Sequence, residues 1–174
     1  SIPDKKNLPN GYIKLWPQDF IVEEIALGGE VQTIYQDKFL SKKRDFFFEE
    51  PVIGATLVKC GLSTIEAVEE LAKDLKIEKE TIKYAGIKDK HAITSQLISI
   101  KGGDAEKLHD LSLPYLFVKN TFSEKRELFI GGLQGNQFTI LIRTEYTLPE
   151  KEFSLRLKKV QEDGFYNFYY LQRF

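Results

Sequence analysis

Short runs in which apolar positions alternate with polar ones, or cluster, occur along most of the chain and predict β-strands. Residues 20–25 form a β-prone run that ends at a Gly-Gly pair, and residues 55–60 form an apolar run typical of a buried strand. Residues 93–100 form another β-prone run. Weaker strand candidates lie at 12–15, 116–119 and 127–130.

The clearest strand pattern covers residues 135–143. Within it Phe138, Ile140 and Ile142 alternate with polar neighbours, so one face of the strand is expected to be apolar. The aromatic run 46–48 is expected to lie partly in the core.

The clearest helix pattern begins at Ser63, which forms an S-x-x-E capping box with Glu66. Its apolar residues repeat every three or four positions, as expected for one buried face: Ile65, Val68, Leu71, Ala72 and Leu75. Shorter helical segments are predicted at 79–83 and 104–111. A last helix follows Pro149, with a stop at Gly164. The predicted class is α+β, with a mixed, mainly antiparallel sheet and covering helices.

The composition is that of an ordinary globular chain, with 174 residues, 42% apolar and 29% charged. No apolar run approaches the roughly 20 residues that span a bilayer, and no secretory leader is visible, so no membrane partner is expected. The single cysteine, Cys60, cannot form an internal disulfide, which favours a reducing cytoplasm.

The charged and ligating residues limit the possible partners. Two histidines and one cysteine, spread far apart, predict no metal site. The net charge of -1 argues mildly against a nucleic-acid partner, since phosphate binding usually needs a basic surface; a local basic patch is the alternative. The basic run 42–44 is more typical of a loop than of a binding site.

The two ends of the sequence suggest a piece of a longer protein. The chain begins at Ser1, contains no methionine, and ends at Phe174 without a helix cap or polar tail.

The most distinctive stretch for chemistry is residues 86–96, GIKDKHAITSQ, in which Asp89 lies between Lys88 and Lys90. Two nearby cations favour the ionised carboxylate, and Gly86 permits a tight turn or a close ligand. One interpretation is a solvated turn. The other is a carboxylate nucleophile or base held at a loop tip by the strand that follows.

Several stretches in order resemble one family, the TruD-type tRNA pseudouridine synthases. Residues 14–24, KLWPQDFIVEE, resemble its opening motif, and residues 86–96 resemble its G-x-K-D-x-x-A-x-T-x-Q catalytic motif. Residues 135–138, GNQF, and 164–174, GFYNFYYLQRF, resemble its G-N-x-F and closing elements. Residues 59–77 also follow the family pattern.

The resemblance implies a function that composition alone does not. The family isomerises a uridine in tRNA, at position 13, to pseudouridine without cofactor or metal, and the matching nucleophile is Asp89. Whether the aspartate adds to the base or to the sugar is left open. Either route needs an ionised, closely held carboxylate.

Four further residues match family site positions. Lys14 matches a lysine that sits by the carboxylate, Phe20 and Phe138 match aromatics at the substrate, and Asn136 matches a binding asparagine. Each also has a plain structural interpretation: a surface lysine, core aromatics and a turn residue. Lys14 is expected within about 4 Å of Asp89, because Lys88 and Lys90 point away from Asp89 in an extended segment.

The chain departs from the family pattern at two places. Tyr170 stands where the family has glycine, and the chain ends before the inserted TruD-specific domain and the second half of the catalytic domain. Residues 1–174 are thus expected to be an N-terminal portion of that domain, inactive alone. A non-catalytic RNA-binding or assembly module is the alternative.

Overall fold

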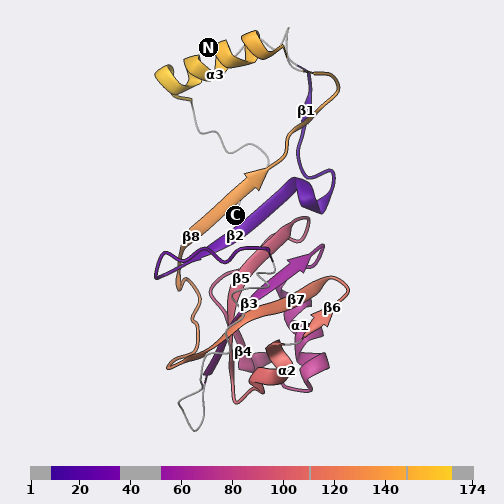
Figure 1. Ribbon diagram of the computed structural model, residues 1–174, viewed down its shortest axis with the longest axis vertical. Helices are drawn as coiled ribbons and strands as arrows, with labels where there is room; N and C mark the ends of the chain where they lie inside the picture. Colours follow the sequence, from indigo (N-terminus) through magenta and orange to yellow (C-terminus); the bar gives the residue numbers. More distant parts are fainter. Residues whose placement is uncertain (1–8, 36–51, 110, 148, 166–174) are drawn as a thin grey trace. The chain divides into compact units, whose positions relative to one another are not determined.

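The computed structural model describes residues 9–35, 52–109, 111–147 and 149–165 (Figure 1). The chain divides into two compact units, Ile13–Leu141 and a smaller unit drawn from Ser1–Tyr12 and Ile142–Phe174. The expected α+β class with a mainly antiparallel sheet is confirmed. None of the helices in the described ranges has the length and apolar character needed to cross a membrane.

The larger unit is built on one sheet with the order β6-β7-β3-β5-β2-β8, in which β4 also pairs with β5. Among the described strands of this sheet, β2 and β5 alone pair in parallel, and the other neighbours are antiparallel. The strands are β2 (Phe20–Ala26), β3 (Val52–Cys60), β4 (Ile82–Tyr84), β5 (Ile93–Lys101), β6 (Ser112–Leu113), β7 (Leu116–Glu124) and β8 (Leu133–Ile140).

The loop that joins β4 to β5 is forced out of the plane of the sheet. The end of β5 pairs with β4 (98–100 with 82–84), whereas its start pairs with β2 (93–95 with 21–23). Because β2 occupies the place beside the start of β5, residues 85–92 cannot continue β4 along it. They lie instead over the face of the sheet that carries α1, where their hydrogen bonds are made.

Two helices cover this face, α1 (Thr64–Leu75) and α2 (Ala105–His109). The predicted capping box is present, with Glu66 N donating to Ser63 Oγ at 3.1 Å and Ser63 N to Glu66 Oε2 at 2.7 Å. The main core lies between these helices and β3, β5 and β7. Its fully buried side chains include Ile53, Leu57, Leu71, Ile98, Ile100 and Leu108.

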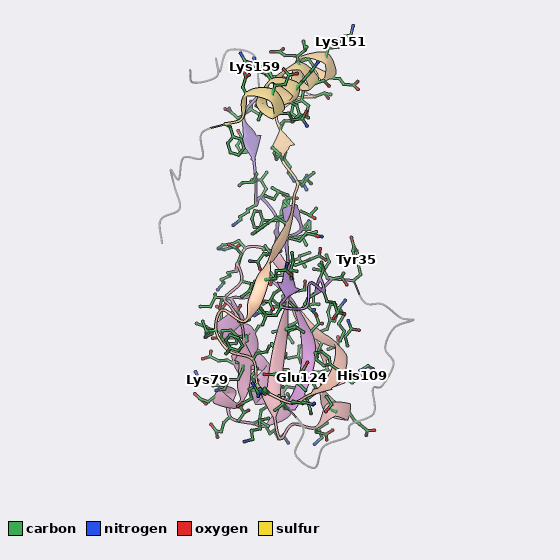
Figure 2. The ribbon with its side chains drawn as sticks, turned by 90° about the vertical axis from the view of Figure 1, so that its left-hand side faces the viewer. Tyr35, Lys79, His109, Glu124, Lys151 and Lys159 are labelled. Carbon is green, nitrogen blue, oxygen red and sulfur yellow. The ribbon has the colours of Figure 1, made fainter. Side chains whose placement is uncertain are left out.

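The opposite face of the sheet is crossed by residues 31–35, which are held by polar side chains. Thr56 Oγ1 donates to Gln32 Oε1 at 2.5 Å, and the Ser95 hydroxyl donates to the Gln32 carbonyl. Lys119, only 5% exposed, donates to Thr33 Oγ1 at 2.8 Å and to the Tyr35 carbonyl. The Tyr35 ring is itself exposed (Figure 2).

Three sequence-based expectations in this unit need correction. Residues 12–15 are not one strand, because Lys14 has a left-handed backbone (φ 59°) that ends any extended run. Residues 79–83 form a single 3-10 turn (Lys79–Thr81) that passes into β4. Residues 127–130 are wrong as a strand: Leu128 N donates to Ser99 Oγ at 2.8 Å, so the side chain of β5 replaces a strand partner.

The predicted apolar side of residues 135–143 exists but is not buried. Phe138, Ile140 and Ile142 are 53%, 45% and 62% exposed. β8 lies at the end of the sheet order and, among the described strands of this unit, pairs with β2 alone. The aromatic run 46–48 and the basic run 42–44 lie outside the described residues.

The smaller unit contains one short antiparallel pair, β1 (Gly11–Tyr12) with β9 (Arg143–Thr144), and helix α3 (Glu150–Asp163). Figure 2 shows Lys151 and Lys159 on α3. The helix ends as predicted at Gly164, whose φ of 72° suits a residue without a Cβ. Its apolar residues Phe153, Leu157 and Val160 are each about half-exposed.

Candidate active site

Lys14 and Asp89 form an ion pair on the covered face of the sheet. Lys14 Nζ lies 3.0 Å from Asp89 Oδ1, and the two side chains are 28% and 34% exposed. The expectation that these residues lie within about 4 Å is therefore confirmed. The same ammonium lies 3.9 Å from the centre of the Phe20 ring, a cation–π contact that fixes it from a second side.

The two lysines beside Asp89 in sequence bind other carboxylates. Lys88 Nζ lies 2.6 Å from Glu24 Oε2, with both side chains almost fully buried, and Lys90 Nζ lies 2.5 Å from Glu66 Oε1 at the surface. Lys14 is thus the cation that contacts the Asp89 carboxylate among the described residues.

Glu66 joins the loop to the start of α1. Hydrogen bonds from Lys90 and from the capping box lower the pKa of Glu66 to about 2. Its carboxylate accepts from the Ser63 main chain at 2.7 Å and from Lys90 at 2.5 Å. The residue after Asp89 is therefore tied to the first turn of the helix.

The main chain before Asp89 is held by a chain of buried hydrogen bonds. Lys88 N donates to Thr64 Oγ1 at 2.9 Å, and Thr64 Oγ1 donates to Gln96 Oε1 at 2.9 Å. Gln96 Nε2 then donates to the Gly86 carbonyl at 2.9 Å. The first link joins the loop to α1, the second joins α1 to β5, and the third joins β5 back to the loop. The main chain before Asp89 is therefore anchored on two elements.

Gly86 does not use the backbone freedom that the sequence suggested. It is absent from the residues with positive φ, and a Cβ built there would meet Leu133 and the Lys88 ammonium at an ordinary 3.6 Å. The shape of this loop follows from its side-chain anchors rather than from glycine.

A fourth lysine, Lys59, lies beneath the loop and was not identified from the sequence. Its side chain is 1% exposed, and Nζ donates to the carbonyls of Leu62 at 2.6 Å and Asp89 at 2.9 Å. Burial lowers the pKa of Lys59 to about 8, and the Asp89 charge opposes that shift. The available signal was a lone lysine inside the apolar run 55–60.

Phe20, Asn136 and Phe138 lie on the same face of the sheet as this loop. In the β2–β8 register Val22 faces Phe138 and Glu24 faces Asn136, so alternation puts these side chains with Phe20 on one face. The rings of Phe20 and Phe138 meet edge to face, 5.9 Å apart. Phe20 is 8% exposed, whereas Phe138 is 53% exposed.

This arrangement suits covalent or acid–base chemistry on an aromatic ligand. It offers a half-exposed, paired carboxylate, an exposed ring and an amide on one face. The described ranges contain no group of three His, Cys, Asp or Glu residues placed to hold a metal ion. Thr94 and Gln96 lie on β5 beneath the loop, where Gln96 supports it.

The chain is similar to known proteins over much of its length. The family model described as tRNA pseudouridine synthase D (TruD) matches residues 5–174. "Probable tRNA pseudouridine synthase D 2" of Methanococcus maripaludis is 32% identical over 171 residues, covering 95% of this chain and 41% of that protein. "Pseudouridylate synthase 7 homolog" of Mus musculus is 35% identical over 120 residues, covering 68% of this chain and 18% of that protein.

A solved structure is also similar. The Methanosarcina mazei protein crystallised under the description tRNA pseudouridine synthase D (TruD) has a TM-score of 0.69 and 26% identity, covering 91% of this chain and 32% of that one. The present chain spans 41% and 43% of the length of two Methanococcus relatives that it matches along nearly its whole length. From its sequence and its fold, the chain belongs to the tRNA pseudouridine synthase D family.

Proposed function

We propose that the protein containing this chain isomerises a uridine of tRNA to pseudouridine, with Asp89 as the nucleophile. The observation that carries the proposal is the Lys14–Asp89 pair at 3.0 Å on an anchored, half-exposed loop. The lysine orients the carboxylate, and an anchored carboxylate loses little further freedom on attack. Family membership supports the reaction class.

The reaction rearranges bonds within one nucleotide and needs no external reactant. The bond from N1 of uracil to C1′ of ribose breaks, the bond from C5 to C1′ forms, and the proton on C5 moves to solvent while N1 gains one. An Asp89 carboxylate oxygen forms a transient covalent bond to the nucleotide and is released at the end. Addition to the base and addition to the sugar both satisfy this balance.

The neighbouring residues then have separate roles. Lys14 pairs with the Asp89 carboxylate and orients it, and Phe20 fixes Lys14 through its ring. The exposed ring of Phe138 packs against the target base, a contact worth roughly 1–3 kcal/mol. Asn136, on the same face, donates to or accepts from the uracil edge.

The proposed substrate is tRNA, with uridine 13 as the target. A base inside a stem or stack cannot reach Asp89, so it must be flipped out at a cost of a few kcal/mol. The exposed apolar side of β8 provides aromatic surface that offsets part of this cost. No cofactor is required by the bond changes, and a reducing cytoplasm is the proposed compartment.

Residues 1–174 are proposed to form an N-terminal portion of the catalytic domain. The support is the coverage of its Methanococcus relatives, in which the chain spans 41% to 43% of the length. A TruD-specific inserted domain and a second half of the sheet would account for the remainder. The 174-residue chain alone is therefore expected to lack turnover.

The test uses the full-length protein and tRNA carrying tritium at C5 of uridine. Tritium release is expected with the wild type and is expected to fall by at least about 10⁴-fold with Asp89→Asn, because the amide cannot act as the nucleophile. Binding of tRNA, measured in a salt titration, should change little. Asp89→Asn activity within about tenfold of wild type would exclude the nucleophile role.

The rival function is RNA binding without catalysis. It would give tRNA binding with no tritium release by the wild type, whichever uridine is labelled.

A further inference from the structure

Lys59 places a charged group where an apolar residue would be less costly. It lies on β3 directly after a run of buried residues, and the β3–β5 register sets it opposite buried Thr94. Removing an ammonium from water carries a large penalty, and well-packed apolar residues often replace buried ions without loss of stability. A lysine here therefore calls for a use that packing does not provide.

The hydrogen bonds of Lys59 indicate that use. Nζ donates to the Leu62 carbonyl at 2.6 Å, in the turn that leads into α1, and to the Asp89 carbonyl at 2.9 Å. One buried group thus joins the main chain of the candidate nucleophile to the start of the main helix. Lys14 contacts the same aspartate at its carboxylate, so two cations fix its two ends.

The charged surroundings of Lys59 fit a group that stays protonated at neutral pH. Burial lowers its pKa to about 8, the Asp89 and Glu66 carboxylates raise it, and the Lys88 ammonium lowers it; Cys60 is the remaining titratable neighbour. Its side chain is 1% exposed, so it does not reach a substrate directly.

We propose that Lys59 is a positioning residue for Asp89, which holds the main chain of the nucleophile against the turn before α1. The proposal rests on the function proposed above for Asp89. A displacement of about 1 Å at a reacting group can cost about 100-fold in rate, so a main-chain anchor can matter as much as a direct contact.

The experiment compares two buried lysines in the full-length protein, Lys59→Met and Lys119→Met. Lys119 is a matched control because it is 5% exposed on neighbouring strand β7, is also bound to a main-chain carbonyl, and lies on the opposite face. Single-turnover rates at saturating tRNA, tRNA affinity and melting temperature are measured for both variants.

Lys59→Met is expected to lower the single-turnover rate about 100-fold with tRNA affinity within about threefold of wild type. Lys119→Met is expected to keep both values within about threefold while also losing thermal stability. Equal rate losses in the two variants, or a Lys59→Met rate within about fivefold of wild type, would overturn the proposal.

Hydrogen exchange gives a readout that does not depend on catalysis. Amides of residues 86–90 should exchange faster in Lys59→Met than in Lys119→Met, and equal protection in this segment would overturn the proposal. If Lys59→Met does not fold, Lys59→Gln, whose shorter amide side chain leaves the Asp89 carbonyl poorly bonded, takes its place with the same expectations.

The outcomes separate this proposal from the proposed function. An inactive wild type, or an active Asp89→Asn, contradicts the function while leaving the exchange result for Lys59 interpretable. If the wild type is active and Asp89→Asn is inactive, but the Lys59 variants keep the wild-type rate and exchange, only the positioning role is contradicted.

Discussion

Lys14 and Asp89 are 75 residues apart in sequence, yet Lys14 Nζ lies 3.0 Å from Asp89 Oδ1. The pair is made possible by two local features. Lys14 adopts a left-handed backbone conformation before β2. The β4–β5 loop leaves the plane of the sheet and lies over the face that carries α1. The lysine therefore approaches the carboxylate from the segment that precedes β2, while Lys88 and Lys90 bind other carboxylates.

Removing the Lys14 charge should slow the reaction. Lys14→Gln is expected to lower the single-turnover rate by about 100-fold, the usual scale for a lost electrostatic contact at a reacting group. The measurement is tritium release from saturating tRNA. Lys79→Gln is the control, because Lys79 pairs at the surface with Glu69, outside the site. Equal rates for the two variants would show that the Lys14 contact is dispensable.

The buried pair between Lys88 and Glu24 should be costly to break from one side. Glu24→Gln leaves the Lys88 ammonium buried without its partner charge, so the free energy of unfolding should fall by about 3–5 kcal/mol. Urea denaturation at pH 7 measures the change. In the double variant Glu24→Gln, Lys88→Met, the free energy of unfolding should fall by less than the sum of its falls in the two single variants.

The exposed pair of Lys79 with Glu69 provides the comparison. Its side chains are 51% and 49% exposed, so Glu69→Gln should lower the free energy of unfolding much less than Glu24→Gln does. If Glu24→Gln lowered the free energy of unfolding no more than Glu69→Gln does, the prediction for the buried pair would be wrong.

The contribution of Lys59 to the free energy of unfolding should change with pH in the alkaline range. Its pKa is about 8 in the folded protein against 10.5 as the ordinary value. Between these values the unfolded chain binds a proton that the folded chain lacks, so the free energy of unfolding rises with pH. The wild type should therefore gain about 3 kcal/mol relative to Lys59→Met between pH 8 and pH 10.5.

Denaturation of both proteins across that range tests the expectation. The other titratable neighbours, Asp89, Glu66, Lys88 and Cys60, are present in both proteins, and the difference isolates Lys59 to first order. A difference that stays constant from pH 8 to pH 10.5 would contradict the burial of this amine.

Glu66 should show the opposite dependence at acidic pH. Its pKa is about 2 in the folded protein against an ordinary 4.5, so its ionised form stabilises the fold above pH 4.5. That contribution is lost as the pH falls through about 2. The stability difference between wild type and Glu66→Gln should thus be full near neutrality and shrink toward pH 2, as thermal melts across this range can show. If the stability difference between wild type and Glu66→Gln were the same at pH 2 as near neutrality, the ionised Glu66 carboxylate would not be its source.

Local sequence patterns determined the elements whose signals were strongest. The capping box of Ser63 and Glu66 and the apolar spacing after it located α1, and apolar runs located β3 and β5. These signals are local because caps and side-chain periodicity depend on neighbours within one or two turns. The same reasoning failed at residues 127–130, where a side chain of β5 takes the hydrogen bond that a strand partner would have made.

The sequence by itself also determined the family and Asp89 as the candidate nucleophile, because motifs in order identify both. The resemblance also predicted Lys14 as the cation beside Asp89, and the tertiary structure confirms that contact. Only the tertiary structure decided what anchors the Asp89 backbone and which carboxylates Lys88 and Lys90 bind. Lys14, Lys88 and Lys90 are chemically alike, and their partners follow from the displaced β4–β5 loop rather than from spacing. In the sequence, Lys59 is only a lone lysine within an apolar strand. Its two acceptors are main-chain carbonyls that folding brings to it. Main-chain acceptors occur at every residue and leave no mark in a sequence, so their use is visible only once the chain has folded.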